Sequence, residues 1–290
     1  MGINLLANHT KLLYVDNAQL SFIDSLQTLI SDHNLSIVLI PELIEGKLKQ
    51  RLAQLNNEAE QAALILDNKH KLSLVSGGLS VAPEWDKLQR RVVSAGRKSE
   101  LILQAAKISA DSQVLDATAG FGHDSLILAS TGAQVLMLEQ QPLMALLLLS
   151  EQQRMSQQPN WQKLMARLTI INCDALSYFS HLPNNFDEAK RAVNVVYLDP
   201  MFPADSYQDS KTGKGAKVGK QMQALHQLAE PPTLAEEQQL LQSAQALVSQ
   251  SSKKQGRVIV KRPQQAPFLA NKVPDESWHN AAVRFDGYFI

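Results

Sequence analysis

An aspartate, two prolines and an aromatic ring follow an apolar run at residues 195–203, which read Val-Val-Tyr-Leu-Asp-Pro-Met-Phe-Pro. The apolar run predicts a buried strand, and the prolines restrict the backbone of the turn after it. Open α/β sheets bind their ligands at the carboxyl ends of strands. There, the Asp199 carboxylate and the Pro200 carbonyl could hold an exocyclic NH2 group while the Phe202 ring stacks on a base. The segment therefore favours chemistry on a planar amino group, with an ordinary strand and proline turn as the alternative.

A glycine-containing turn forms a second candidate site at residues 116–124, which read Asp-Ala-Thr-Ala-Gly-Phe-Gly-His-Asp. Gly120 and Gly122 would let the backbone pass close to a ligand at the start of a helix. Glu139 ends the next predicted strand, at the distance where an acid binds ribose hydroxyls. Asp174 ends the third strand and is placed to accept a hydrogen bond from an adenine amino group. These strand ends together predict a cofactor that contains a nucleoside.

Two cofactors fit this arrangement. NAD requires the fuller motif Gly-x-Gly-x-x-Gly, in which the helix N-terminus binds the pyrophosphate, but Ser125 stands at the third glycine position. S-adenosylmethionine carries a cationic sulfonium and an amino group instead, and an acid before the turn, Asp116, suits those charges better. We therefore expect S-adenosylmethionine, with an NAD-dependent oxidoreductase as a rival hypothesis.

The elements that must position these residues alternate between strands and helices from about residue 112 onward. Apolar runs predict strands at 114–115, 134–138, 168–171, 195–198 and 257–260. Strands separated by helices indicate an α/β fold with a parallel, doubly wound sheet, whose ligand site lies at the strand carboxyl ends. Residues 282–289 alternate apolar and polar side chains, which predicts a closing edge strand.

The first 80 residues predict a separate small N-terminal α/β domain. The predicted elements are strands at 12–15, 36–40, 63–66 and 72–75, a turn at 67–70, and a helix at 45–61. A helix-prone stretch at 85–108 begins the remainder of the chain. Because 290 residues exceed the usual size of one domain, we expect two domains, residues 1–80 and residues 81–290.

The charges balance, because the chain has 28 lysine and arginine residues and 28 aspartate and glutamate residues. A nucleic-acid surface would therefore require local segregation of charge. Two basic segments without acids are candidates, each with a solvated charged face as the alternative. The residues expected to bind RNA phosphates are Lys211, Lys214, Lys217 and Lys220 in the first segment, and Lys261 and Arg262 in the second.

The single cysteine, Cys173, excludes a disulfide within the chain and suits a reducing compartment. The N-terminus lacks the basic and apolar regions of a signal peptide. The richest apolar run, 143–149, is too short to span a bilayer and predicts a buried helix face. The histidines show no metal-ligand spacing. We therefore expect a cytoplasmic protein with no membrane partner and no metal.

The glycine turn at 116–124, Met-Leu-Glu at 137–139 and the turn Leu-Asp-Pro-Met-Phe-Pro occur in this order along the chain, followed by Val-Lys-Arg-Pro at 260–263 and Arg-Phe-Asp at 284–286. With these motifs, the chain resembles the ribosomal RNA small subunit methyltransferase J family over roughly residues 75–290. The resemblance implies a Rossmann-like class I S-adenosylmethionine-dependent methyltransferase. It also implies N2-methylation of one guanine in 16S rRNA, with 16S rRNA or the small ribosomal subunit as the partner.

The resemblance assigns roles by motif position: the helix start, the second strand end and the third would contact the cofactor, its ribose and its adenine, respectively. The expected cofactor-binding residues are Asp116, Ala117, Gly120, Gly122, His123, Asp124, Glu139, Gln140, Asp174, Ala175 and Asp199. The expected catalytic residues are Asp199, Pro200 and Phe202. The family usually has arginine where His123 and Gln140 stand here. A methyltransferase that acts on DNA adenine or a protein amide, and a catalytically silent RNA-binding module, are the alternatives.

Overall fold

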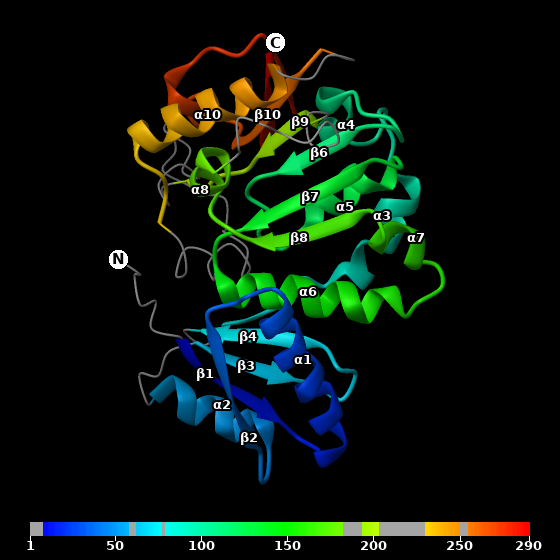
Figure 1. Cartoon of the computed structure of the whole chain (residues 1–290), viewed down its shortest axis with the longest axis vertical. Helices are drawn as coiled ribbons and strands as arrows, with labels where there is room; N and C mark the ends of the chain where they lie inside the picture. The colour runs from blue at the N-terminus through cyan, green and yellow to red at the C-terminus, as the bar shows by residue number, and fades with distance from the viewer. Residues whose placement is uncertain (1–7, 58–61, 77–78, 182–192, 203–229, 250–254) are drawn as a thin grey trace.

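The structure is a computed structural model that describes residues 8–57, 62–76, 79–181, 193–202, 230–249 and 255–290. Two β-sheets organise these residues, with strand orders β2-β1-β3-β4-β5 and β11-β12-β10-β9-β6-β7-β8. Figure 1 shows the seven-stranded sheet above the five-stranded sheet, with helix α6 (Pro142–Ser156) running between them. The larger sheet contains every strand end that the sequence predicts to carry a site.

Five parallel strands form the body of the larger sheet: β6 (Gln113–Asp116), β7 (Gln134–Glu139), β8 (Leu168–Asn172), β9 (Val193–Leu198) and β10 (Arg257–Pro263). The chain adds β7 and β8 on one side of β6, then returns to add β9 and β10 on the other. The strand order therefore reverses between β6 and β9. Ligands bind at such a reversal in α/β sheets, and the predicted parallel, doubly wound sheet is confirmed.

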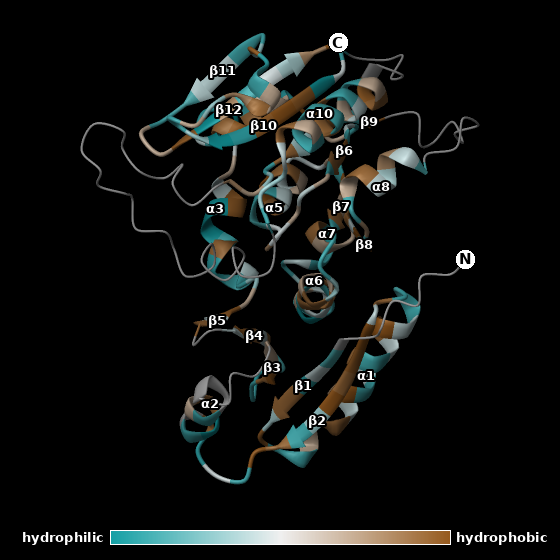
Figure 2. Cartoon of the chain, turned by 90° about the vertical axis from the view of Figure 1, so that its left-hand side faces the viewer, coloured by the Kyte–Doolittle hydropathy of each residue, from teal (hydrophilic) through white to brown (hydrophobic). Residues whose placement is uncertain are grey.

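Strand β12 (Val283–Phe289) runs antiparallel to β10 and lies between β10 and β11 (Glu276–His279). The predicted strand at 282–289 is present, but the prediction that it forms the edge of the sheet is wrong, because β11 occupies the edge. The sequence of β11, Glu-Ser-Trp-His, has no apolar run, and three of its four residues are exposed. Figure 2 shows this contrast between the teal β11 and the brown β10.

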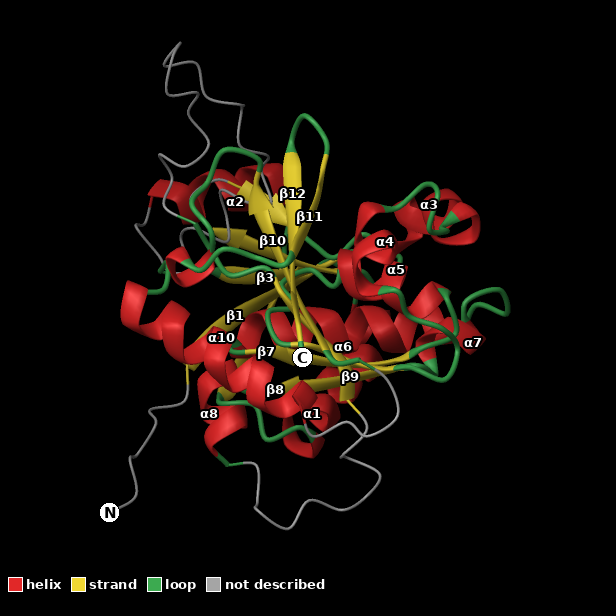
Figure 3. Cartoon of the chain, turned by 90° about the horizontal axis from the view of Figure 1, so that it is seen from above, coloured by secondary structure: helices red, strands yellow, loops and turns green. Residues whose placement is uncertain are grey.

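Helices cover both faces of the larger sheet. Seen from above in Figure 3, α8 (Ala175–Ser180) and α10 (Leu234–Ser249) lie on one side, and α3 (Gln89–Ser94), α4 (Leu101–Ala106) and α5 (His123–Ser130) lie on the other. Alternate residues of β9 enter the two layers: Val195 and Tyr197 join the cluster with α5, whereas Val196 and Leu198 join the cluster with α10. Burial on both faces explains the continuous apolar run in this strand.

Residues 85–108 are largely helical, as the sequence predicts, but they do not form one continuous helix. They form a 3-10 turn at Trp85–Leu88, followed by α3 and α4. Ala95 has an extended backbone, with ψ 133°, which ends α3. Ser99 then accepts a hydrogen bond from the backbone N–H of Gly96. A hydroxyl that bonds a nearby backbone group competes with helix continuation.

The smaller sheet consists of β1 (Asn8–Tyr14), β2 (Ile37–Leu43), β3 (Ala63–Leu66), β4 (Leu72–Ser76) and β5 (Leu79–Val81). Strand β1 is parallel to β2 and β3, whereas β4 is antiparallel to β3 and β5. Helices α1 (Leu20–Asp32) and α2 (Leu48–Asn57) complete this unit. The predicted domain boundary at residue 80 falls inside β5, so the first sheet extends to Val81.

One continuous buried cluster joins the two sheets. It contains Leu12 and Leu74 of the smaller sheet, Trp85 of the connecting segment, and Leu146 of α6. The apolar run at 143–149 is buried, as the sequence predicts, and its residues from Met144 onward are at most 4% exposed. Among the described helices, none is long and apolar enough to cross a membrane.

Candidate active site

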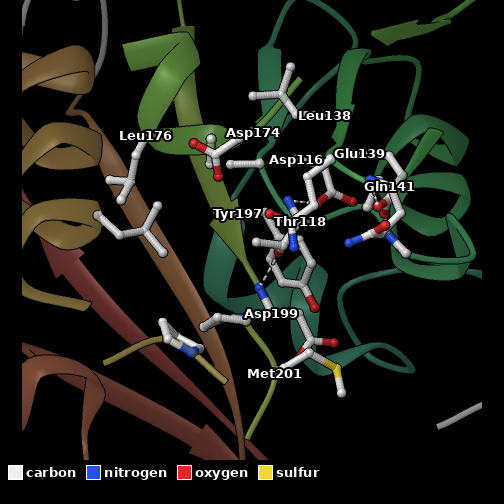
Figure 4. Close-up of a pocket in the computed structure, with 18 of the residues that line it drawn as sticks. Asp116, Thr118, Leu138, Glu139, Gln141, Asp174, Leu176, Tyr197, Asp199 and Met201 are labelled. Atoms are coloured by element: carbon white, nitrogen blue, oxygen red, sulfur yellow. Dashed lines mark hydrogen bonds between the residues drawn. The ribbon is translucent and has the colours of Figure 1, made fainter. Parts of the chain in front are cut away.

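A cavity of about 620 Å³ opens at the carboxyl ends of β6, β7, β8 and β9. Its volume lies within the range of roughly 300–1,000 Å³ that is typical of ligand pockets. Figure 4 shows side chains from several of these strand ends around it. The predicted cofactor-binding and catalytic residues that line the cavity are Asp116, Ala117, Gly120, His123, Asp124, Glu139, Gln140, Asp174, Ala175, Asp199, Pro200 and Phe202. The expected convergence of the two motifs on one pocket is therefore present.

Asp116 fixes the turn between β6 and α5. Its side chain is buried, with Oδ1 accepting from the backbone N–H of Thr118 at 3.2 Å and Oδ2 accepting from the Ser125 hydroxyl. Burial raises the pKa of Asp116 to about 7, although both hydrogen bonds oppose that shift. Ser125 stands at the place of the third glycine in the NAD motif, and here it ties the helix to the strand end.

The two glycines of this turn have different structural roles. Gly120 (φ +54°) lines the cavity, and a Cβ built there would meet no atom within 4 Å. Gly122 (φ +72°) is not among the cavity-lining residues, and a Cβ there would stand 2.7 Å from Met137 Cε and 3.0 Å from Trp85 Cζ2. The expectation that both glycines admit a ligand is therefore corrected, because Gly122 serves close packing beneath the turn.

The segment before α3 supports the turn from behind. The fully buried Trp85 donates its indole N–H to the Phe121 carbonyl at 2.8 Å. His123 Nε2 lies 2.6 Å from the Pro83 carbonyl oxygen. Burial lowers the pKa of His123 in spite of this contact, which favours a neutral ring. Sequence reasoning missed Trp85 and Pro83, since no motif or periodicity marks a residue that packs under a loop from 36 positions away.

Glu139 connects the end of β7 to the glycine turn. Its Oε2 accepts from the Gly120 N–H at 3.0 Å, and its Oε1 accepts from the Gln141 N–H at 2.8 Å. Burial raises the pKa of this carboxyl to about 7. Each carboxylate oxygen can accept two hydrogen bonds, so the group can still take donors from a ligand. The amide of Asn172 donates to the Glu139 carbonyl at 2.7 Å and thereby joins the ends of β7 and β8.

Asp174 begins helix α8 as its N-cap. Its Oδ2 accepts from the Ser177 N–H at 2.8 Å, which satisfies one of the free backbone donors of the first turn. The side chain is half-buried and lines the cavity beside Ala175. The expected contact with adenine stays a prediction, and it would have to coexist with this cap.

Residues 199–202 after β9, which we call the acceptor turn for their expected role, bond directly to the glycine turn at 116–124, which we call the cofactor turn. The backbone N–H of Asp199 donates to Thr118 Oγ1 at 2.6 Å. The Asp199 Oδ2 atom accepts from Lys261 Nζ at 2.9 Å, and the same ammonium donates to Asp124 Oδ2 at 2.7 Å. The Tyr197 hydroxyl also donates to Asp124 Oδ2, at 2.7 Å. One lysine thus joins an aspartate of each turn.

The charged groups of this network shift one another's pKa values. Burial raises the pKa of Asp199, and the nearby Asp124 carboxylate adds to that rise, while Lys261 opposes it. Burial would also raise the pKa of Asp124, but Lys261 and the Tyr197 hydroxyl outweigh it and hold the pKa below its usual value. The two carboxylates raise the pKa of Lys261 against the effect of burial.

Lys261 and Arg262, which the sequence predicts to bind phosphates, do not lie on an open basic surface. Lys261 pairs with the two aspartates inside the cavity. The Arg262 side chain is 5% exposed, pairs with Glu237 at 2.5 Å, and lies with its Cζ atom 4.7 Å from the centre of the Phe202 ring. The expected RNA-binding residues Lys211, Lys214, Lys217 and Lys220 lie outside the described residues.

The comparisons with known proteins decide the family. Residues 47–290 match the model of a family described as putative SAM-dependent methyltransferases. A ribosomal RNA small subunit methyltransferase J from Psychrobacter cryohalolentis is 71% identical over 282 residues, covering 97% of this chain and 95% of the relative. The chain belongs to the ribosomal RNA small subunit methyltransferase J family. The family likeness therefore begins well before residue 75, where the resemblance seen in the sequence motifs begins.

More distant relatives agree with the fold of this methyltransferase family. A methyltransferase J from Acinetobacter baumannii is 37% identical over 243 residues, covering 84% of this chain and 82% of the relative. The crystal structure of a SAM-dependent methyltransferase from Neisseria gonorrhoeae matches with a TM-score of 0.63 at 26% identity, covering 97% of this chain and 96% of that one.

S-adenosylmethionine is the cofactor of this family, and the site fits it. The open space beside Gly120 admits a ligand against the backbone, and Glu139 offers a buried carboxylate at the end of the second strand. A buried acid at this position suits ribose hydroxyls. The fold, the cofactor and the enzyme class predicted from the sequence are confirmed.

Proposed function

We propose that this protein transfers the methyl group of S-adenosylmethionine to the exocyclic N2 atom of a guanine in 16S rRNA. The observation that carries the proposal is the hydrogen bond from the Asp199 N–H to Thr118 Oγ1, 2.6 Å long. It fixes the acceptor turn against the cofactor turn within one cavity. The names of the relatives support the small-subunit RNA as substrate.

In this proposal the strand ends bind successive parts of the cofactor. The turn from Asp116 to Asp124 holds the methionine end, with Ala117, Gly120 and His123 lining the cavity. Glu139 and Gln140 flank the ribose, and Asp174 and Ala175 flank the adenine. Asp116 and Gly122 contribute indirectly, since the first ties the turn to α5 and the second packs on Trp85.

The chemistry asked of the protein is mainly positioning. When bound, S-adenosylmethionine supplies a methyl group already activated by its sulfonium, so no strong general base is needed. The Asp199 carboxylate and the Pro200 carbonyl would accept hydrogen bonds from the guanine amino group and aim its nitrogen at the methyl carbon. Alignment of this kind can contribute roughly 7–11 kcal/mol to a reaction. The guanine must be unpaired or turned out of its helix to enter the cavity.

Phe202 is the proposed stacking surface for the base. The side chain is 3% exposed and one face carries the Arg262 guanidinium. A base would therefore have to stack on the opposite face, on the side of the cavity that Phe202 lines. Base stacking on an aromatic side chain contributes about 1–3 kcal/mol in single-strand sites.

We further propose that the RNA phosphates are held by the lysines at 211, 214, 217 and 220, which follow the acceptor turn in the sequence. A ribosomal RNA substrate would require the cytoplasmic location that the sequence predicts. Within this proposal 16S rRNA, free or assembled in the small subunit, is the partner.

An acceptor turn for a planar amino group would also suit DNA adenine or a protein amide. Incubation of the protein with tritium-labelled S-adenosylmethionine and, in parallel, with small-subunit RNA, duplex DNA and ribosomal proteins separates these substrates. We expect acid-precipitable label in the RNA alone, removed by ribonuclease. Label that resists ribonuclease and yields to protease or deoxyribonuclease would overturn the proposal.

A further inference from the structure

We infer that Lys261 is a positioning residue for methyl transfer, which holds the Asp199 carboxylate ionised and oriented toward the acceptor amino group. The inference rests on the proposed function for its substrate and on the described contacts for its geometry. It replaces the phosphate contact that the sequence predicts for this lysine.

The geometry of the ammonium supports this role. Lys261 Nζ lies 2.9 Å from Asp199 Oδ2 and 2.7 Å from Asp124 Oδ2, so two of its three N–H groups point to carboxylates. The side chain is 26% exposed and lines the cavity. Hydrogen bonds between ionised partners are short and about twice as strong as neutral ones. A phosphate at the third N–H group would lie close to both aspartates, whose negative charges would repel it.

The surroundings of Asp199 make a cation necessary. The Asp199 side chain is 22% exposed, and the residue directly follows strand β9, which is buried on both faces. The groups that act on its charge are Lys261 and Arg262 of β10, Asp124 of α5, Asp116 of β6 and Tyr197 of β9. The other titratable groups lining the cavity are His123, Glu139, Cys173, Asp174, Glu230 and Glu236. Most of these groups are acidic, and the two aspartates bonded to Lys261 would repel each other without it.

The ionisation state matters because an ionised carboxylate only accepts hydrogen bonds, whereas a protonated one also presents an O–H donor. The guanine amino group is itself a donor, so a protonated Asp199 would lose an acceptor that aims the nitrogen. Removal of Lys261 should raise the pKa of Asp199, because the opposing positive charge is lost while burial and Asp124 remain. The rate of transfer should then require a higher pH.

The test compares Lys261→Met, which keeps the length of the side chain without its charge, with Lys261→Arg and with Lys272→Met. Lys272 is an exposed lysine bonded to Gln245 and serves as the matched control. In single-turnover methylation at saturating RNA and cofactor, Lys261→Met should lose about 10²-fold in rate, the cost of misplacing a reacting group by about 1 Å. The acid limb of its pH–rate profile should move to higher pH, and Lys261→Arg should recover part of the rate.

A double variant shows whether the lysine acts through Asp199. In the Asp199→Asn background, Lys261→Met should cause little further loss, because the group it positions is already absent. Independent effects that multiply would overturn the inference, as would an unchanged pH profile. So would a Lys261→Met protein that transfers normally at saturating RNA but binds RNA more weakly, with a salt dependence reduced by about one phosphate contact.

A measurement on the protein alone separates this inference from the proposed function. Carbon-13 NMR of labelled aspartate carboxyls, with Asp199 assigned by its loss in Asp199→Asn, reports the titration of Asp199 directly. Its pKa should rise in Lys261→Met and stay unchanged in Lys272→Met. If this shift is found and no RNA is methylated, the function is wrong and the pairing stands. If Asp199 titrates alike in all three proteins, the inference is wrong.

Discussion

Two buried carboxyl groups, Asp116 and Glu139, flank the cofactor turn, and burial raises the pKa of each to about 7. Between the pKa of the unfolded chain and that of the folded chain, the folded chain keeps a proton that the unfolded chain has lost. The stability of the fold therefore decreases as the pH rises through this range. For Glu139, the favourable contribution of the protonated group is complete below its unfolded value of 4.5 and disappears as pH rises to about 7. These two buried acids of the cavity therefore reduce the stability of the folded protein as the pH rises toward 7.

Glu139→Gln tests this cost, since glutamine stays neutral at every pH and its amide oxygen can still accept from one of the two backbone N–H groups. The stability of the native protein relative to the variant should fall by about 1–3 kcal/mol between pH 5 and pH 8. Urea unfolding of both proteins at pH 5, 6, 7 and 8 gives the difference. A difference that stays constant, or that grows with pH, would show that Glu139 is not a buried acid of raised pKa.

The carboxylates at strand ends could be located from the sequence, because an acid after an apolar run at a parallel strand marks the binding edge of the sheet. Their partners could not. Lys261 lies 62 residues from Asp199, and Thr118 lies 81 residues from it. The segment with Lys261 and Arg262 contains no acid, so the sequence alone suggested that these residues bind phosphate. The sheet instead brings Lys261 to two aspartates and Arg262 to Glu237.

At the scale of elements, the strand–turn–helix unit from β6 to α5 depends on contacts from outside it. Trp85 lies under the turn, donates to the Phe121 carbonyl and occupies the space beside Gly122. Met137 of β7 closes the same space. The shape of the cofactor turn is therefore set by the segment before α3 and by the neighbouring strand, as well as by its own glycines.

The two glycines form a matched pair for testing this arrangement. Gly120→Ala places a Cβ in open space beside the cavity and should cost about 1–2 kcal/mol of stability, from its left-handed backbone alone. Gly122→Ala carries the same backbone cost and also forces Met137 and Trp85 apart, which adds about 1–3 kcal/mol. Urea unfolding measures both losses. Calorimetry should show weaker cofactor binding for Gly120→Ala, and equal stability losses in the two variants would contradict the packing role of Gly122.

Most elements of the larger sheet were predictable, because strands buried on both faces appear as apolar runs. Strand β11 was not, since its residues are polar and it is held through its backbone pairing with β12. The break between α3 and α4 depends on a local hydrogen bond between Ser99 and Gly96 that competes with helix formation. Amphipathic patterns carry neither kind of information.

At the scale of the whole molecule, the two sheets share one buried cluster through α6 and Trp85. Composition and turn signals predicted two domains, but the sequence could not show that the apolar faces of both units meet. The cluster includes Leu74 of β4 together with Leu146 and Leu148 of α6. The smaller sheet therefore supports the helix that follows β7, and with it the Glu139 end of the cofactor site.

Leu74→Ala tests whether the two units unfold together. Leu74 is fully buried in the smaller sheet, and truncation of such a side chain costs about 2–5 kcal/mol. Because the cluster is shared, we expect a single calorimetric transition that moves to lower temperature as a whole, with equal calorimetric and van't Hoff enthalpies. Two transitions, of which only the first moves, would show that the units are energetically separate.

We propose that this chain methylates the N2 atom of a guanine in a cavity where Asp199 orients the amino group. The most direct test is mass spectrometry of the nucleosides released from 16S rRNA after reaction with the protein and S-adenosylmethionine. We predict N2-methylguanosine at a single position with the native protein, and strongly reduced N2-methylguanosine with a folded Asp199→Asn variant that still binds RNA. A different methylated nucleoside, or an undiminished yield with Asp199→Asn, would contradict the account.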